Sequence, residues 1–127
     1  MNATKVTILI VFTILLIFNV VSRIFFNDFQ EGWNAYEKKD FKTASELWLP
    51  LAEQGEPRAQ FFLGFMQDMG FGVPEDDKKA LKWYQLDAEQ GDSRAQLFTG
   101  YIYDFGNGVP EDDQKAVKWY QLAAKQG

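Results

Sequence analysis

The sequence contains no cysteine and no histidine among its 127 residues. Without cysteine the chain has no disulfide framework, no thiolate nucleophile and no cysteine-ligated zinc site. Without histidine it lacks the usual imidazole metal ligand and the side chain most often used as a general base near neutral pH. We therefore expect no metal site, no cofactor and no catalytic residues, and a function other than that of an enzyme.

Clustered basic residues are also lacking. The formal net charge is −5, and from Arg23 onward 12 basic residues face 18 acidic ones without forming a basic stripe. Nucleic-acid binding depends on grouped lysine and arginine side chains that displace counterions from phosphates. The acidic body of the chain therefore argues against a nucleic-acid partner.

One long apolar run is present, near the N-terminus. It covers residues 6–21, is interrupted by only three polar residues, and follows a short start with Lys5 as its single charge. Such a run is typical of a signal peptide or of a membrane anchor, which needs about 20 residues to cross the hydrocarbon core. We expect residues 1–22 to be one of these two, with cleavage before Arg23 in the first case.

The basic start of the chain also predicts on which side of the membrane the rest of the protein lies. A positive flank favours an N-terminus that stays cytoplasmic. The remaining residues are then expected on the extracytoplasmic side of the cell envelope. They would be periplasmic or secreted after cleavage, or anchored to the membrane by residues 6–21 without it.

The rest of the sequence repeats itself with a period of 36 residues. Residues 55–90 and 91–126 align without gaps, and 23 of the 36 positions are identical. A fixed period between about 20 and 50 residues indicates a repeat architecture in which each unit packs on its neighbours.

Each unit contains the signals of two helices. Glu56 or Asp92 supplies an N-cap, and Pro57 stands at the first helical position, where a missing N–H group costs nothing. Glycines that tolerate positive φ end the first helix, and an aspartate followed by a second apolar stripe begins the next. The expected helices lie near residues 57–69, 77–90, 93–105 and 113–126.

A divergent unit precedes these two. Ala44, Ala52 and Gly55 lie in phase with the second helix of the later units, and residues 29–38 supply a first helix. The linking turn is shorter, since twelve residues separate Gly32 from Ala44 where the next unit has sixteen. We predict an all-α solenoid of three helix hairpins, with residues 28–54 as an N-terminal cap followed by repeats at 55–90 and 91–127.

These residues resemble the Sel-1-like repeat family, which is related to the tetratricopeptide repeats. The similarity rests on Ala59-Gln60-x-x-Leu63-Gly64, Gly70-x-Gly72-Val73-x-x-Asp76 and Lys79-Ala80-x-x-Trp83-Tyr84, which largely recur one period later. It covers two units closely and a third loosely, roughly residues 29–127. The resemblance implies an α-solenoid that acts as an adaptor for protein partners, often at membranes or in envelope assemblies.

Three motifs allow a second interpretation. The acidic run 75–77 could bind a hard cation, but it lacks the ligand spacing of a calcium loop, so helix capping is favoured. The glycine pair at 70–72 could cradle a nucleotide, but the third glycine and a Gly-Lys-Ser/Thr sequence are missing, which favours a turn. Trp83-Tyr84 could stack sugars or bases, but their helical spacing favours the core.

An enzyme is the competing class of function. Some members of the resembled family have been proposed to act on β-lactams. None of Ser22, Ser45 or Ser93 is followed by lysine three residues later, as the serine β-lactamase pattern requires. A hydrolase of β-lactam-type substrates remains the alternative to a protein-binding scaffold.

The first helices of the two close units carry the candidate binding surface, on what is expected to be the concave side of the solenoid. Their side chains repeat on one face and lie mostly off the motif positions that define the core, although ordinary exposed surface is the alternative interpretation. The candidate partner-binding residues are Arg58, Phe61, Phe65, Asp68, Arg94, Leu97, Tyr101 and Asp104.

The last hairpin keeps the apolar stripe of an internal one. Ala116, Trp119, Tyr120 and Ala124 repeat the internal pattern, although a terminal hairpin usually needs a polar outer face. Either the repeats continue in a longer protein, or a partner or a second copy covers this end. We expect residues 23–127 to self-associate through the final hairpin.

Overall fold

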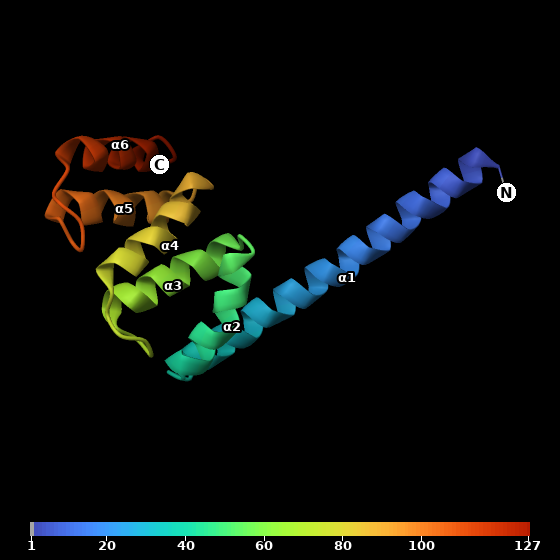
Figure 1. Ribbon diagram of the computed structural model, residues 1–127, viewed down its shortest axis with the longest axis horizontal. Coiled ribbons are helices and arrows are strands. Elements are labelled where there is room, and N and C mark those ends of the chain that lie inside the picture. Colours follow the sequence, from blue (N-terminus) through green and yellow to red (C-terminus); the bar gives the residue numbers. More distant parts are fainter. Residues whose placement is uncertain (1) are drawn as a thin grey trace.

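The computed structural model describes the backbone of residues 2–127 and the side chains of residues 2–23 and 28–127. The described chain is helical without any strand, which confirms the predicted all-α class. Figure 1 shows α2 to α6 stacked in one block while the N-terminal part of α1 projects away from it. The helices are α1 (Ala3–Glu37), α2 (Phe41–Glu53), α3 (Pro57–Met69), α4 (Asp77–Glu89), α5 (Ser93–Phe105) and α6 (Asp113–Ala124).

The five helices of the block begin at acidic caps. Each cap side chain accepts a hydrogen bond from a backbone N–H group in the first turn, which would otherwise lack a partner. The caps are Asp40, Glu56, Asp76, Asp92 and Asp112. At the other end of α3 and α5, Gly70 and Gly106 adopt φ angles of 66° and 67°. Capping and turn formation are thus confirmed for the acidic runs and the glycine pairs.

The helices pack in chain order as three hairpins, α1 with α2, α3 with α4, and α5 with α6. The hairpins stack through α2 against α3 and through α4 against α5. Only residues 38–40 link α1 to α2, whereas residues 70–76 link α3 to α4, so the tighter first turn is confirmed.

Small residues allow the two helices of each hairpin to approach closely. A glycine of the first helix lies against an aromatic ring of the second, in the pairs Gly32 and Trp48, Gly64 and Tyr84, and Gly100 and Tyr120. A Cβ atom on Gly64 would lie 2.9 Å from Cδ1 of Tyr84, closer than van der Waals contact allows. The ring can therefore lie directly on the backbone of the facing helix.

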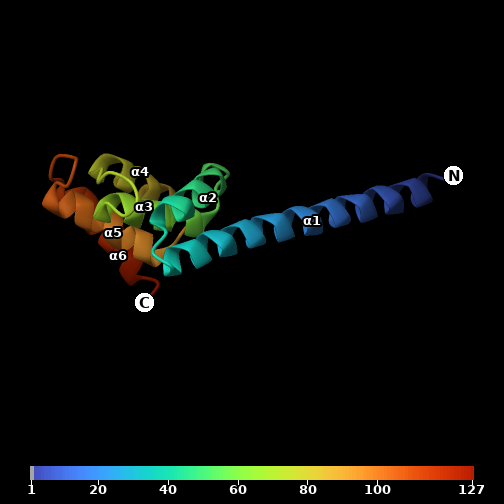
Figure 2. The same ribbon diagram turned by 90° about the horizontal axis from the view of Figure 1, so that it is seen from below.

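α1 differs from the sequence-based expectation of two separate segments, because it joins the apolar run and the first helix of the first hairpin. With 35 residues it is about 50 Å long at a rise of 1.5 Å per residue. The apolar side chains of residues 6–21 are exposed, so this segment is not a buried core helix. In the described part of the chain, α1 is the one helix long and apolar enough to cross a membrane. Figure 2 shows from a second side that the N-terminal part of α1 projects away from the other helices.

Candidate protein-binding surface

Arginine side chains join neighbouring hairpins at both junctions of the stack. The guanidinium carbon of Arg58 lies 4.1 Å from the centre of the Phe29 ring, and that of Arg94 lies 4.6 Å from the centre of the Phe61 ring. A guanidinium over an aromatic face contributes about 0.5–2 kcal/mol. Arg58 and Arg94, expected from the sequence to bind a partner, therefore take part in the stacking of the repeats.

Two further contacts recur at the same junctions. The side-chain amide of Gln60 donates to the carbonyl of Ala52 at 3.0 Å, and that of Gln96 donates to the carbonyl of Ala88 at 3.2 Å. The stacked ring pairs are Phe62 with Trp48 and Phe98 with Tyr84, each with centroids 5.1 Å apart. Each junction thus places Arg, Gln and Phe of one first helix against a ring, a carbonyl and a second ring of the preceding hairpin. We call these three the junction contacts.

Phe61, another predicted binding residue, lies inside the stack. Its side chain is 8% exposed because the Arg94 guanidinium and the Phe98 ring of the next hairpin cover it. Phe65 is half-buried, with its ring centre 5.9 Å from that of Phe71 in the following loop. These two side chains of α3 therefore offer a partner less surface than the sequence pattern predicts.

The two predicted aspartates connect the helices of their own hairpins. The Tyr84 hydroxyl donates to Asp68 at 3.4 Å, and the Tyr120 hydroxyl donates to Asp104 at 3.1 Å. Burial raises the pKa of the Asp68 carboxyl, and the nearby charge of Asp77 adds to this effect. Both carboxylates therefore have a structural role in their own hairpins.

The remaining predicted residues lie on α5 and are largely exposed. Leu97 is 53% exposed and Tyr101 is 47% exposed. Phe105, which the sequence analysis missed, is 59% exposed, and its ring centre lies 4.5 Å from that of Tyr101. Its place four residues after Tyr101 on the same helical face was the signal available in the sequence. Arg94, Leu97, Tyr101 and Phe105 recur at helical spacing on one face of α5, and we call this set the α5 stripe.

The outer side of the last hairpin is exposed where the internal hairpin is covered. Leu81 is 7% exposed and Ala88 is 2% exposed, whereas their counterparts one period later, Val117 and Ala124, are exposed. Tyr120 is likewise half-buried where its counterpart is fully buried. We call Leu97, Val117, Tyr120 and Ala124 the end face. Self-association through this hairpin stays a prediction.

Asp87 lies at the second junction and is fully buried. Among the described residues, neither of its carboxylate oxygens has a hydrogen-bond partner. Burial and, to a lesser degree, the negative charge of Asp92 raise the pKa of this carboxyl to about 7. The positive charge of Arg94 lowers the pKa and partly offsets these two effects. The equivalent residue one period later, in the last hairpin, is Ala123. The repeat fold therefore does not require a carboxylate at this position.

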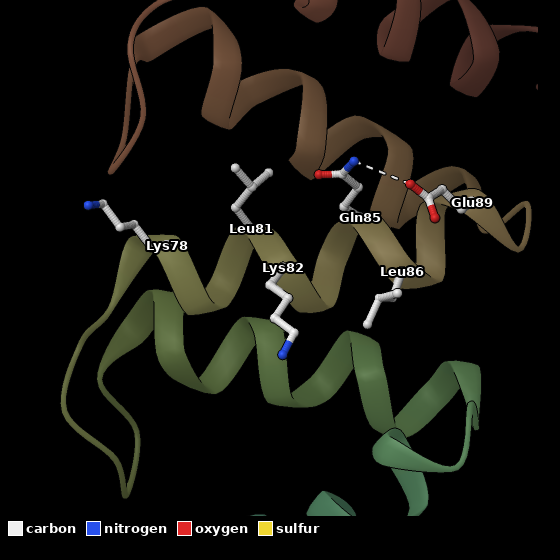
Figure 3. A pocket seen from close by; sticks show the side chains of 6 residues that line it. All are labelled: Lys78, Leu81, Lys82, Gln85, Leu86 and Glu89. Atoms are coloured by element: carbon white, nitrogen blue, oxygen red, sulfur yellow. Dashed lines mark hydrogen bonds between the residues drawn. The ribbon is translucent and has the colours of Figure 1, made fainter.

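A hollow along α4 is drawn in Figure 3. It is lined by Lys78, Leu81, Lys82, Gln85, Leu86 and Glu89. All six residues belong to one helix, and the amide of Gln85 donates to Glu89 at 3.2 Å. A hollow built by a single helix does not surround a ligand as a binding cleft does. A similar hollow on α6 indicates that this feature follows from the repeat.

The glycine pair, the Trp83-Tyr84 motif and the acidic run, which the sequence allowed to be read as ligand sites, have structural roles. A Cβ atom on Gly72 would lie 2.6 Å from the backbone carbon of Phe41, so this glycine lets its loop approach the preceding hairpin closely. Trp83 and Tyr84 are 8% and 0% exposed, which places them in the core. In residues 2–23 and 28–127, no three or more Asp or Glu side chains come together in a group that could hold a metal ion.

Comparisons with known proteins agree with this architecture. Residues 57–92 and 93–127 each match the family model of the Sel1 repeat. The crystal structure of a Sel1 repeat protein from Oxalobacter formigenes is similar, with a TM-score of 0.73 and 35% identity over 77% of this chain and 40% of that one. The protective antigen c5321 of uropathogenic Escherichia coli, which displays an SLR fold, has a TM-score of 0.76 and 36% identity over 79% of this chain and 22% of its own.

This chain therefore spans less than half of the length of either solved structure. No match was found among the curated proteins. The resemblance that the sequence motifs indicated is confirmed by both the repeat matches and the solved structures.

Proposed function

The chain belongs to the Sel1 repeat family, and from this premise we propose that it is an extracytoplasmic scaffold that binds a protein partner through the α5 stripe. Sel1 repeat proteins are generally protein–protein interaction scaffolds and typically not enzymes. The observation that carries the proposal is the exposure of Leu97, Tyr101 and Phe105 on one helical face beside Arg94.

The composition of the α5 stripe supports this assignment. Aromatic and arginine side chains contribute most of the binding energy in many protein interfaces, and contiguous exposed apolar groups mark interaction sites. The other large apolar side chains exposed on the block are Leu49, Met69, Leu86, Val117 and Leu122. Leu49 lies on α2 and Leu86 on α4, so each is an exposed leucine outside the α5 stripe and serves as a control position.

Replacing Leu97 and Tyr101 together with alanine is expected to reduce partner capture by at least about tenfold. Capture is measured by a crosslinking pull-down from the native envelope with the full chain. Both side chains are exposed, so the thermal unfolding midpoint should change little. Phe61→Ala is unsuitable for this test, since Phe61 is buried and its loss would destabilise the second junction.

The control for capture is Leu49→Ala, which removes an exposed leucine of α2. Capture by this variant should equal that of the unchanged chain. Equal capture by the double variant and the control would show that the α5 stripe is not the binding surface.

We further propose that residues 6–21 anchor the protein in the membrane and that the block lies outside the cytoplasm. The support is the uninterrupted course of α1 from Ala3 to Glu37, which carries the exposed apolar segment directly into the first hairpin. About 20 helical residues cross the hydrocarbon core, so the remaining turns reach the block without a flexible linker. Lys5 at the start of α1 favours a cytoplasmic N-terminus.

An anchored chain is expected to stay in the membrane fraction after alkaline carbonate washing and to have the mass of the complete sequence. Added protease should digest the block in cells whose outer barrier is opened, while the cytoplasmic side stays intact. A soluble product that begins at Arg23 would instead establish a cleaved signal peptide. Protection of the block from protease would place it in the cytoplasm.

A further inference from the structure

We propose that the turn between α2 and α3 rests on the membrane surface and contacts phospholipid headgroups, as a second attachment beside the helix that anchors the protein. The proposal rests on the proposed membrane anchor and goes beyond it, because it concerns the folded block. We call residues 54–56 the membrane-facing turn.

Two charged residues mark where α1 enters and leaves the hydrocarbon core. Residues 6–22, between Lys5 and Arg23, carry no charge, and at a rise of 1.5 Å per residue they cover about 25 Å. Their number lies within the range of about 17–25 residues that membrane-spanning helices need, and charged side chains are costly inside the core. Ser22 therefore lies at the extracytoplasmic boundary of the hydrocarbon core.

The chain returns to the level of Ser22 after α2. Beyond Ser22, α1 continues to the tight turn at residues 38–40, and α2 then packs back along it. Ser22 lines one hollow together with Leu51, Gln54, Gly55 and Glu56. Figure 1 and Figure 2 both show the turn between α2 and α3 on the side of the block from which α1 projects. The membrane-facing turn thus lies beside the end of the membrane-spanning segment.

The thickness of a bilayer places this turn among the headgroups. The hydrocarbon core is about 30 Å thick and the whole bilayer about 40–45 Å, so each headgroup layer is about 5–7 Å deep. The membrane-facing turn shares a hollow with Ser22, which lies at the inner boundary of this layer. The turn therefore meets headgroups when residues 6–22 span the core.

The side chains around the hollow suit this environment. The hydroxyl of Ser22 and the side-chain amide of Gln54 are exposed, and both have N–H or O–H groups that can donate to phosphate oxygens. The Glu56 carboxylate accepts from Nε of Arg58 at 2.8 Å and from the N–H group of Ala59 at 2.9 Å. Its negative charge is thereby compensated, so the turn offers donors to the phosphates without strong repulsion from Glu56.

The next hairpin holds the membrane-facing turn in position. The side-chain amide of Gln90 donates to the carbonyl of Gly55 at 3.2 Å and to Oε1 of Gln60 at 2.8 Å. Gln60 in turn donates to the carbonyl of Ala52 at the end of α2. The level of the turn is therefore fixed by the stack of hairpins as well as by α1.

The opposite end of the first hairpin provides a control position. Lys38 comes 16 residues after Ser22, which corresponds to about 24 Å along the direction of α1. The usual helix tilt of about 20° shortens this height only slightly. Lys38 therefore lies in water, well beyond the headgroup layer.

The experiment uses the absence of cysteine from the sequence, because a single introduced cysteine can then be labelled with a fluorophore. The full-chain variants Gln54→Cys, Lys38→Cys and Ile14→Cys are labelled and reconstituted in phosphatidylcholine vesicles. The vesicles contain a phospholipid with a nitroxide quencher either on its headgroup or in the middle of its acyl chain. All three side chains are exposed, so the variants should fold normally, and unfolding midpoints check this.

We expect the headgroup nitroxide to remove most of the fluorescence of the label at Gln54→Cys and little of that at Lys38→Cys. The acyl-chain nitroxide should quench the label at Ile14→Cys most strongly, because Ile14 lies in the middle of the apolar segment. This pattern would place the membrane-facing turn in the headgroup layer.

Two results would overturn the proposal and leave the membrane anchor intact, provided that Ile14→Cys is quenched. One is equal quenching of Gln54→Cys and Lys38→Cys by the headgroup nitroxide, and the other is quenching of neither. A label at Ile14→Cys that neither lipid quenches would overturn the anchor and the membrane-facing turn together.

Discussion

Replacing Trp48 with alanine is expected to lower the free energy of unfolding by about 3–5 kcal/mol, the range for truncating a buried large aromatic side chain. Trp48 is 0% exposed and stacks with Phe29 and Phe62 at centroid distances of 5.5 and 5.1 Å. Its indole Nε1 also donates to the carbonyl of Phe29 at 3.1 Å. Because these contacts join α1, α2 and α3, the substitution weakens the packing between α1 and the repeats.

The measurement is urea unfolding of the full chain followed by circular dichroism. The matched control is Leu49→Ala on the same helix, where the side chain is 43% exposed, so the free energy should change by no more than about 0.5 kcal/mol. A loss below about 1 kcal/mol for Trp48→Ala would mean that α2 is not packed on α1 and α3 as described.

Replacing Asp87 with asparagine is expected to stabilise the protein by about 2–4 kcal/mol at pH 8, and by much less at pH 3.5. Burial, followed by the charge of Asp92, raises the pKa of this carboxyl from its usual 3.8 to about 7. The folded state therefore holds its proton more tightly than the unfolded state does. Stability from this group is fully present below pH 3.8 and is lost as the pH rises towards 7.

The free energy of unfolding is measured at several pH values for the unchanged protein and for the Asp87→Asn variant. The advantage of Asp87→Asn should grow between pH 4 and 7 and then stay constant. Asp76→Asn is a control with the opposite sign, because the backbone N–H of Lys79 lowers the pKa of the Asp76 carboxyl. An advantage of Asp87→Asn that does not vary with pH would contradict a buried ionised carboxylate at the junction.

Local signals in the sequence predict most of the fold. The acidic caps, Pro57 and the glycines after each first helix depend on backbone groups within one turn, so they set the bounds of α3 to α6 closely. The join between residues 6–21 and the first hairpin was not predicted, because residues 1–22 were interpreted as a separate signal peptide or membrane anchor that ends before Arg23. Polar side chains do not end a helix when no proline or glycine follows them.

The binding surface was predicted only in part, because burial at a repeat junction is decided by the next hairpin. Phe61 and Leu97 occupy the same position in consecutive units, yet one is 8% and the other 53% exposed. The position of Arg94 within the repeat could have indicated that its side chain lies over Phe61 and buries it. No local pattern distinguishes Asp87 from an exposed aspartate, since its burial follows from the packing of α4 on α5.

Site-specific photocrosslinking of the full chain in its native envelope tests whether a protein partner binds the α5 stripe. A photoreactive phenylalanine analogue is placed in turn at Leu97, Tyr101 and Phe105, and at the control positions Leu49 and Leu86, all of which are exposed. If one protein binds the α5 stripe, the three α5 positions should give one shared adduct and the controls should give none. Adducts from the controls alone, or the same adducts from all five positions, would contradict binding at the α5 stripe.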